Sequence, residues 1–422
     1  MKRAPVSLAL AAVLSVLGAL APAARAATLP LAGDSLYALP PEAAVRRALQ
    51  AMPQLRLGAM NEELAATEQA RLNAGPYEWI ARAGTSQRRV AGVERFREHE
   101  WGLERGVRWF GKADQDRAIG EQGMTLAAAQ RADVWHEACR TLMQDWYSAL
   151  RAQAVLQRLG EQHALVQQLK AVAERRVKAG DSPALEVLQA DTELRRSEAL
   201  VEQARQDVAQ ALALLSATYQ QLPAPAPTGL PEPRTASETM PAQVSRITQD
   251  NHELDLAQAE AQLYQLKARR AASERTPDPT IALRATRERD GQERTVGLSV
   301  SIPLPGQVRA SEASAATVRA RMAEERARQV EAKVQLDAQR VVAEERHSHQ
   351  VWASLRAVAE QSARQAQLME RAYQSGESSL SDALLSRRQA LEAALAAQTA
   401  QINALAASAR VQLDAHALWS ID

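Results

Sequence analysis

The 422-residue sequence has a single cysteine, Cys139, and only two phenylalanines. One cysteine cannot form a disulfide within the chain, and it cannot supply a zinc site made of several thiolates. Glycine and proline, at 18 residues each, are scarcer than in an average protein, so long irregular loops should be few. Aromatic residues make up only 4% of the chain, which argues against a large globular core rich in aromatics.

The sequence also lacks an excess of charge of either sign, since 51 Lys and Arg residues oppose 50 Asp and Glu residues. A chain so close to neutrality gives no electrostatic reason to bind nucleic acid. The abundant residues are Ala, Leu, Gln, Glu and Arg, which is the composition of long helices. The chain is therefore expected to be mainly α-helical.

The N-terminus has the pattern of an export signal. Lys2 and Arg3 precede an apolar stretch over residues 6–20, and Ala24-Arg25-Ala26 follows it. This order is typical of a secretory signal peptide, so residues 1–26 are expected to be removed. Beyond residue 26 there is no run of 18 or more apolar residues, which excludes an inner-membrane protein built from apolar helices.

The remaining sequence contains two similar halves. Three short segments of the first half reappear about 195 positions later, with nearly the same spacing between them. The pairs are 101–103 with 296–298, 109–112 with 304–307, and 176–182 with 372–378. The sequence therefore predicts one structural repeat over residues 27–221, a proline-rich linker over 222–241 and a second repeat over 242–422.

Each half has the pattern of a helix, two strands, a very long helix and a shorter helix. The helices of the first half are predicted over 41–73, where Pro53 can introduce a kink, 112–178 and 182–221. Those of the second half are predicted over 242–275, 307–375 and 377–420. A helix over 112–178 would be about 100 Å long, and apolar residues recur along it with the period of a coiled coil. Such a helix must belong to an elongated antiparallel bundle.

Between the first helix and the long helix of each half, the apolar period changes from about 3.5 to 2. Residues 77–83, 101–109 and 281–286 alternate, and residues 296–304 form the clearest case. Nine to eleven tilted residues suffice for a strand that spans a bilayer. Charged residues are predicted on the opposite face, where they would line a lumen: Arg82, Glu104, Arg108 and Arg284. The alternative is a pair of half-buried hairpins in a soluble domain.

Four strands in one chain cannot close a barrel, because both sheet edges would leave backbone groups unpaired in lipid. If the strands span a membrane, the chain must therefore form oligomers. Three chains would supply twelve strands, an even number that is compatible with a pore.

The order of elements, the duplication and two glycine turns resemble the TolC-like outer-membrane efflux proteins. The most specific segments are residues 179–188 and 375–384, followed by the strand-to-helix junctions at Gly111, Pro305 and Gly306. The short length is most similar to the CzcC-like branch, which serves metal-ion efflux. The resemblance covers essentially the whole mature chain.

This resemblance implies a homotrimer with a twelve-stranded β-barrel in the outer membrane and a helical tunnel through the periplasm. It implies an RND-type inner-membrane pump and a periplasmic adaptor, or membrane fusion protein, as partners. The adaptor would dock at the two periplasmic tip turns, which comprise Gly180, Asp181, Ser182, Gly376, Glu377 and Ser378. The channel itself would be a passive conduit for small solutes, including heavy-metal cations.

The tip turns also follow from the residues alone. Glycine adopts the positive φ that a turn between antiparallel helices requires, and Ser182 and Ser378 can cap the helices that follow. Glu186 and Asp382 hold equivalent positions in the two halves, and in a trimer they could form acidic rings that favour cations. The alternative is an ordinary carboxylate in the first turn of each helix.

Other functions have less support. His136 and Cys139 share a helix face and could bind a soft metal with a third ligand, although a core cysteine is more common there. No catalytic triad or nucleotide-binding motif occurs, so no enzyme activity and no cofactor are expected. The rival classes are a soluble periplasmic coiled-coil adaptor or scaffold and, among channels, a duct for drugs or for type I protein secretion.

Overall fold

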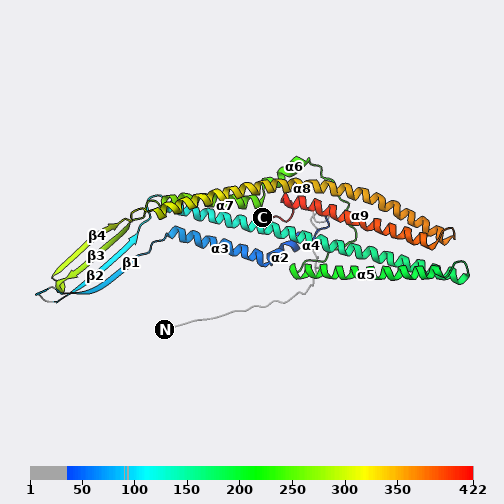
Figure 1. Cartoon of the computed structure of the whole chain (residues 1–422), viewed down its shortest axis with the longest axis horizontal. Coiled ribbons are helices and arrows are strands. Elements are labelled where there is room, and N and C mark those ends of the chain that lie inside the picture. The colour runs from blue at the N-terminus through cyan, green and yellow to red at the C-terminus, as the bar shows by residue number, and fades with distance from the viewer. Residues whose placement is uncertain (1–35, 90, 93–94, 422) are drawn as a thin grey trace, which may run out of the picture.

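The computed structural model describes residues 36–89, 91–92 and 95–421, and the predicted signal peptide lies outside them. Figure 1 shows a long, narrow molecule with a small sheet at one end and two helical hairpin tips at the other. The described elements follow one another as α2 (Glu42–Gln50), α3 (Pro53–Ala74), β1 (Ile80–Arg89), β2 (Arg95–Gly106), α4 (Lys112–Ala179), α5 (Leu185–Thr218), α6 (Met240–Gln249), α7 (His252–Ser273), β3 (Thr280–Glu288), the short 3-10 helix η1 (Arg289–Gly291), β4 (Glu293–Ser301), α8 (Gln307–Gln374) and α9 (Leu380–Asp414).

The two long helices, α4 and α8, have 68 residues each, which corresponds to about 100 Å. Neither contains a proline, and apolar residues recur along one side of α4, so the helix can continue and bury a seam. α3 and α5 pack end to end along α4, while α7 and α9 pack in the same way along α8. Contacts of α4 with α7 and α9 join the two hairpins into one body.

The shorter helices differ from the predicted ranges in their details. The helix expected over 41–73 is divided into α2 and α3, because Pro53 begins a new helix. At the first position of a helix the backbone N–H has no partner within the helix, so proline, which lacks it, is tolerated there. The helix expected over 242–275 is also divided, and the Asn251 side chain caps α7 by accepting from the Leu254 N–H at 3.0 Å. The two shorter return helices each begin three residues later than predicted, at Leu185 and Leu380.

The four strands form one antiparallel sheet in the order β1-β2-β3-β4, so β2 and β3 pair centrally although they come from different halves. The strands lie further from the helices than the alternation predicted. Tyr77, Trp109 and Leu304 fall outside them, and pairing continues through Arg88 and Arg89 because backbone groups pair whatever the side chain.

The largest core lies halfway along the molecule, where α2, α4, α9 and the C-terminal residues meet. Leu49, Leu142, Ala149, Ile402 and Leu405 are almost fully buried there. Within the part of the chain that the structure describes, no helix is both long enough and apolar enough to cross a membrane.

Candidate functional site

The sheet separates polar from apolar side chains. Arg82 lies opposite Gly102, which lies opposite Arg284, so both arginines project from the face that also carries Glu104. We call this the polar face, and its other members include Ser86, Arg88, Glu98, Glu100, Thr286, Glu288, Thr295, Ser299 and Ser301.

The cations of the polar face are neutralised by neighbouring carboxylates. Arg82 Nη2 lies 2.6 Å from Glu104 Oε1, and Arg284 Nε lies 2.9 Å from Glu100 Oε1. The structure thus brings together three of the four residues that were predicted to line a lumen. Arg108 is the exception, since β2 ends at Gly106 and Arg108 lies beyond the sheet.

The opposite face, which we call the apolar face, carries the aliphatic side chains of the strands. Val296 and Leu298 are both 73% exposed, an unusual state for large aliphatic residues in water. Ile281, Leu283 and Val300 lie beside them and are also exposed. Among the described residues, none covers this face of the sheet, which therefore needs an apolar surrounding.

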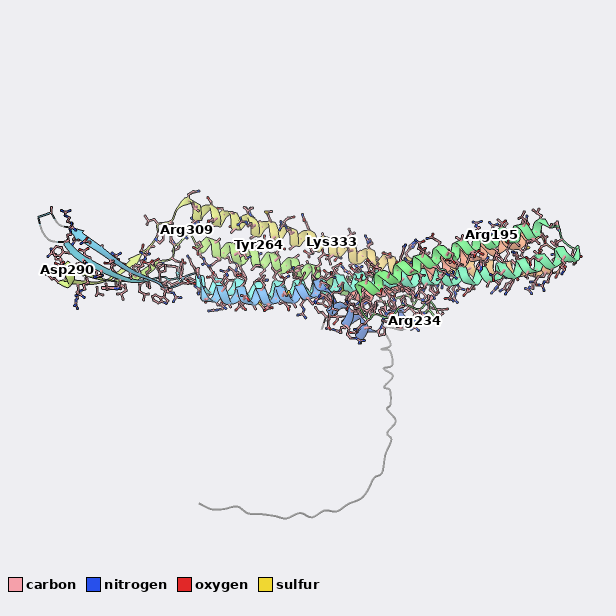
Figure 2. All side chains as sticks on the ribbon, turned by 90° about the horizontal axis from the view of Figure 1, so that it is seen from below. Arg195, Arg234, Tyr264, Asp290, Arg309 and Lys333 are labelled. Carbon is pink, nitrogen blue, oxygen red and sulfur yellow. The ribbon has the colours of Figure 1, made fainter. Side chains whose placement is uncertain are left out.

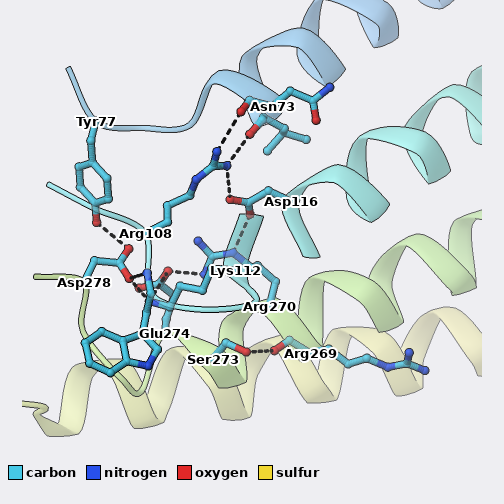
Figure 3. Close-up of polar contacts among 12 residues, drawn as sticks. Asn73, Tyr77, Arg108, Lys112, Asp116, Arg269, Arg270, Ser273, Glu274 and Asp278 are labelled. Atoms are coloured by element: carbon cyan, nitrogen blue, oxygen red, sulfur yellow. Dashed lines mark hydrogen bonds and ion pairs between the residues drawn. The ribbon is translucent and has the colours of Figure 1, made fainter. Parts of the chain in front are cut away.

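A buried charge network fixes the sheet to the helices (Figure 3). Lys112 is only 1% exposed, and its Nζ lies 2.7 Å from Asp278 Oδ1 and 3.3 Å from Glu274 Oε1. Asp278 also accepts hydrogen bonds from the Tyr77 hydroxyl and from the Trp109 N–H. This carboxylate joins the segments before β1, after β2 and before β3 at one point.

The pKa values in this network follow from burial and hydrogen bonding. Burial alone would raise the pKa of Asp278, but the hydrogen bonds from Lys112, Trp109 and Tyr77 outweigh it and hold that pKa below its ordinary value. Burial, reinforced by the bond to Asp278, raises the pKa of Tyr77 to about 12. Both groups therefore keep one charge state at neutral pH.

Arg108 and Asp116 extend the network. Arg108 donates to the Leu72 and Asn73 carbonyls at the end of α3, and its Nη1 lies 3.0 Å from Asp116 Oδ2. Arg270 Nε lies 2.6 Å from the other oxygen of Asp116. The prediction that Arg108 shares a face with the lumen charges is therefore wrong, because its side chain ties α3 to α4.

The three predicted junction residues have different roles. Gly111 has φ +80°, so it supplies a left-handed turn immediately before α4. Gly306 precedes α8 with an extended backbone at φ −129°, which any residue can adopt, and Pro305 lies in the irregular segment before it. Sequence reasoning missed Lys112, Asp278 and Asp116, whose partners are remote in the chain.

At the other end of the molecule, two glycine turns connect the helices of each hairpin. Gly180 and Gly376 have φ +83° and +80°. The next residue in each turn, Asp181 or Glu377, donates its N–H to a carbonyl of the preceding helix at 2.9 or 2.8 Å. This pattern satisfies carbonyls that a helix end would otherwise leave free.

The predicted serine caps are wrong. The Ser182 hydroxyl has no hydrogen-bond partner within the described residues, and α5 has no side-chain cap. Ser378 donates to the Met369 carbonyl instead. Ser379, one residue later, caps α9 by accepting from the Asp382 N–H at 3.2 Å.

Glu186 and Asp382 have equivalent positions but different surroundings. Glu186 Oε2 accepts from the Tyr373 hydroxyl at 2.9 Å, and the Arg176 guanidinium lies 4.8 Å from the centre of the Tyr373 ring. Burial, together with the bond to Glu186, raises the pKa of Tyr373 to about 12. These contacts join the two hairpin tips, and we call Arg176, Glu186 and Tyr373 the tip link.

Asp382 is exposed in the first turn of α9, where its carboxylate accepts a hydrogen bond from the Ser379 hydroxyl at 2.7 Å. Only this acid of the predicted pair presents its charge freely to solvent. It also has the location of an ordinary first-turn carboxylate, which the N-terminus of a helix favours.

Of the two alternatives for His136 and Cys139, the structure has the core cysteine, while His136 is buried rather than on the surface. Cys139 is fully buried, and burial raises the pKa of its thiol to about 12. His136 instead faces Asp414 at 3.2 Å, with the rings of His252 and His416 beside it. Within the described residues, no group of three or more His, Cys, Asp or Glu side chains is placed to hold a metal ion.

A scan against protein-family models found no match for this chain, and a search of curated proteins also found none. Solved structures do match. The CmeC outer-membrane channel of Campylobacter jejuni superposes with a TM-score of 0.72 at 14% identity, over 90% of this chain and 86% of that chain.

Two further structures superpose almost equally well. The outer-membrane protein VceC of Vibrio cholerae matches with a TM-score of 0.70 at 14% identity, over 90% of this chain and 95% of that chain. The open state of the MtrE outer-membrane channel of Neisseria gonorrhoeae matches with a TM-score of 0.71 at 15% identity, over 89% and 88%. The chain therefore has the fold of a TolC-like outer-membrane channel subunit, with long helical hairpins joined to a four-stranded sheet.

Proposed function

We propose that this protein is the outer-membrane channel subunit of a tripartite efflux system. The observation that carries the proposal is the two-faced sheet, whose apolar face is exposed while its opposite face bears paired charges. An antiparallel sheet with one lipid-facing side and one polar side is the building unit of a transmembrane barrel. The alternative of a soluble hairpin would leave Val296, Leu298 and their neighbours in water.

The assembly follows from the two edges of the sheet. β1 and β4 each have a neighbour on one side only, so both would leave unpaired backbone groups in lipid. Pairing of β1 with β4 of the next copy closes the barrel when three copies contribute twelve strands. The halves 27–221 and 242–422 then act as two versions of one unit, which the equal lengths of α4 and α8 support.

The helices of the trimer would form a periplasmic tunnel that ends at the tip turns. We infer that a periplasmic adaptor docks there, on the turns at Gly180 and Gly376, and that an inner-membrane RND pump supplies the energy. CmeC and MtrE are described as outer-membrane channels, and the shared fold supports the channel on which these partners would act.

We further propose that the conduit passes cations, heavy-metal ions included. The tip is the narrowest part of such a tunnel, and there the exposed Asp382 of three copies would form an acidic ring. Glu186 is engaged by Tyr373, so it contributes to the tip link more than to the ring.

Single-channel conductance in planar bilayers tests the proposal. The purified protein should conduct and prefer K⁺ to Cl⁻, and Asp382→Ala should reduce that preference several-fold. Asp207→Ala is the matched control, because Asp207 is an exposed acid of α5 outside the tip. A protein that stays in the soluble periplasmic fraction and never conducts would contradict the channel and favour the scaffold.

A further inference from the structure

The apolar face of the sheet ends in a strip of arginines at the end remote from the helices. In the strand register, Arg287 lies directly opposite Arg294, and Arg89 lies directly opposite Arg95. Arg97 is placed between them on the same face. All five side chains are exposed, and we call this set the arginine belt.

The belt is unusual because its charges lack partners. None of the five guanidinium groups forms an ion pair with another described residue. The nearby Asp290 carboxylate accepts from the backbone N–H of Arg97, at 2.9 Å. Like charges directly opposite each other destabilise a sheet.

The polar face of the same strands shows the opposite arrangement. There Arg82, Arg88 and Arg284 each lie within 4 Å of a glutamate carboxylate. Within the described strands, acidic side chains therefore pair with the arginines of the polar face. None of them pairs with an arginine of the belt. The repulsion within such a row of cations is relieved when anions from outside the chain bind to it.

The belt lies at a defined level on the sheet. His99, opposite Arg287, stacks on Trp101 with ring centroids 5.9 Å apart, and Trp101 borders the aliphatic rows that contain Leu283 and Leu298. In β4, Arg294 lies two residues from Val296, the last aliphatic residue on this side. The arginines therefore begin about 7 Å beyond the row of Val296, because two strand residues span that distance. Figure 2 shows this end of the sheet, marked by Asp290, at the opposite extreme from the hairpin tips.

We propose that the arginine belt binds the phosphate groups of lipids in the outer leaflet of the outer membrane. This inference rests on the proposed channel function, which puts the aliphatic rows in the hydrocarbon and the end near Asp290 on the cell exterior. The planar guanidinium group matches phosphate with two parallel hydrogen bonds, and its flexible stem reaches the headgroup level. A ring of three copies would present fifteen such groups to the surrounding lipid.

The test measures lipid binding to the detergent-purified trimer by native mass spectrometry. The probes are diphosphorylated lipid A and the same lipid after enzymatic removal of its phosphates. The wild-type protein should retain the phosphorylated form at least five-fold better. The triple variant Arg97→Gln/Arg287→Gln/Arg294→Gln should lose that preference.

The matched control is Arg82→Gln/Arg88→Gln/Arg284→Gln, which removes the same charge from the polar face of the same strands. It should keep the preference of the wild type. Equal loss in both variants would show a net-charge effect and overturn the proposal. Displacement of lipid A by millimolar inorganic phosphate would overturn it too, because the belt would then be a site for free anions.

The experiment also distinguishes a loss of folding or of channel function from a loss of lipid binding. If the triple belt variant does not assemble, the wild-type protein alone still tests the proposal, because equal retention of the two lipid forms would contradict it. Planar-bilayer conductance is recorded for every protein. A conducting wild type without phosphate preference would leave the channel function intact and remove only the lipid site, whereas a wild type that neither inserts nor conducts would contradict both.

Discussion

At the scale of single residues, Lys112 is the residue on which the junction between sheet and helices depends most. It is a fully buried cation between Asp278 and Glu274, and both acids belong to the segment that enters β3. A buried ion pair adds little net stability, but removal of one partner leaves the other charge buried without compensation. The junction between sheet and helices therefore depends on keeping the network complete.

We expect Lys112→Met to lower the free energy of unfolding by about 3–5 kcal/mol. Thermal melting followed by circular dichroism measures this effect. The double variant Lys112→Met/Asp278→Asn should recover part of the loss, because it removes both charges while the side-chain oxygen of the new amide can still accept a hydrogen bond from the Trp109 N–H. Arg117→Met is the control, since Arg117 pairs with Asp114 on the surface and should have little effect. Equal melting of Lys112→Met and Arg117→Met would contradict the account.

His136 makes stability depend on pH. Burial lowers its pKa from the ordinary 6.5; the hydrogen bond to Asp414 acts in the opposite direction, and Arg140 adds to the lowering. Below about pH 6.5 the unfolded chain binds a proton at this residue and the folded chain does not. Its contribution to stability is therefore present above that pH and is lost as the pH falls.

We expect the melting temperature to fall between pH 7.5 and pH 5.5, and His136→Asn to reduce that fall. Asp414 does not interfere in this window, because its pKa is lowered to about 2, where burial is outweighed by bonds from His136, Arg140 and Arg410. The control is His347→Asn, at an exposed position of α8. If His136→Asn keeps the full pH dependence, the assignment to His136 is wrong.

At the scale of elements, the tip turns are built on glycine conformation. Gly180 has φ +83°, where a side chain costs about 1–2 kcal/mol. Gly160, inside α4, has helical backbone and nothing within 4 Å of an added Cβ. The same chemical change should therefore have opposite effects inside α4 and in the turn immediately after it.

We expect Gly180→Ala to destabilise the turn by about 1–2 kcal/mol and Gly160→Ala to stabilise α4 by up to about 1 kcal/mol. Amide hydrogen exchange of residues 176–182 reports the local effect. Faster exchange is expected in Gly180→Ala alone. Unchanged exchange in both variants would show that the glycine conformation is not what holds the turn.

Element boundaries show where local patterns suffice. The long helices were predicted to within one residue at each end, because their lack of proline and their apolar period are local properties. The strands were displaced by several residues, since Arg88, Arg89 and Arg95 interrupt the alternation while their backbones remain paired. The cap of α9 was misplaced by one residue, because the exact end of a helix depends on contacts such as that of Ser378 with Met369.

At the scale of the whole molecule, the two faces of the sheet decide how it meets its surroundings. We expect Leu298→Arg to cost about 2–4 kcal/mol of membrane stability, since Leu298 lies among the aliphatic rows. The measurement is the fraction of protein that folds into lipid vesicles as heat-resistant trimers. Ser299→Arg, one residue later on the polar face, should fold as well as the wild type. Equal yields from both variants would mean that the apolar face does not contact lipid.

The sequence by itself determined the class of the fold, the two long helices, the glycine turns and the alternation of the strands, because each of these depends on residues close together in the chain. It predicted that Arg82, Glu104 and Arg284 share a face, since strand alternation is a local rule. Only the tertiary structure decided that Arg108 leaves that face, that Lys112 pairs with Asp278, and that the arginine belt forms one strip. The place of Arg108 depends on its contacts with Leu72 and Asn73 in α3. The other two outcomes depend on strand register and on contacts between residues more than 150 positions apart, and no local period encodes any of them.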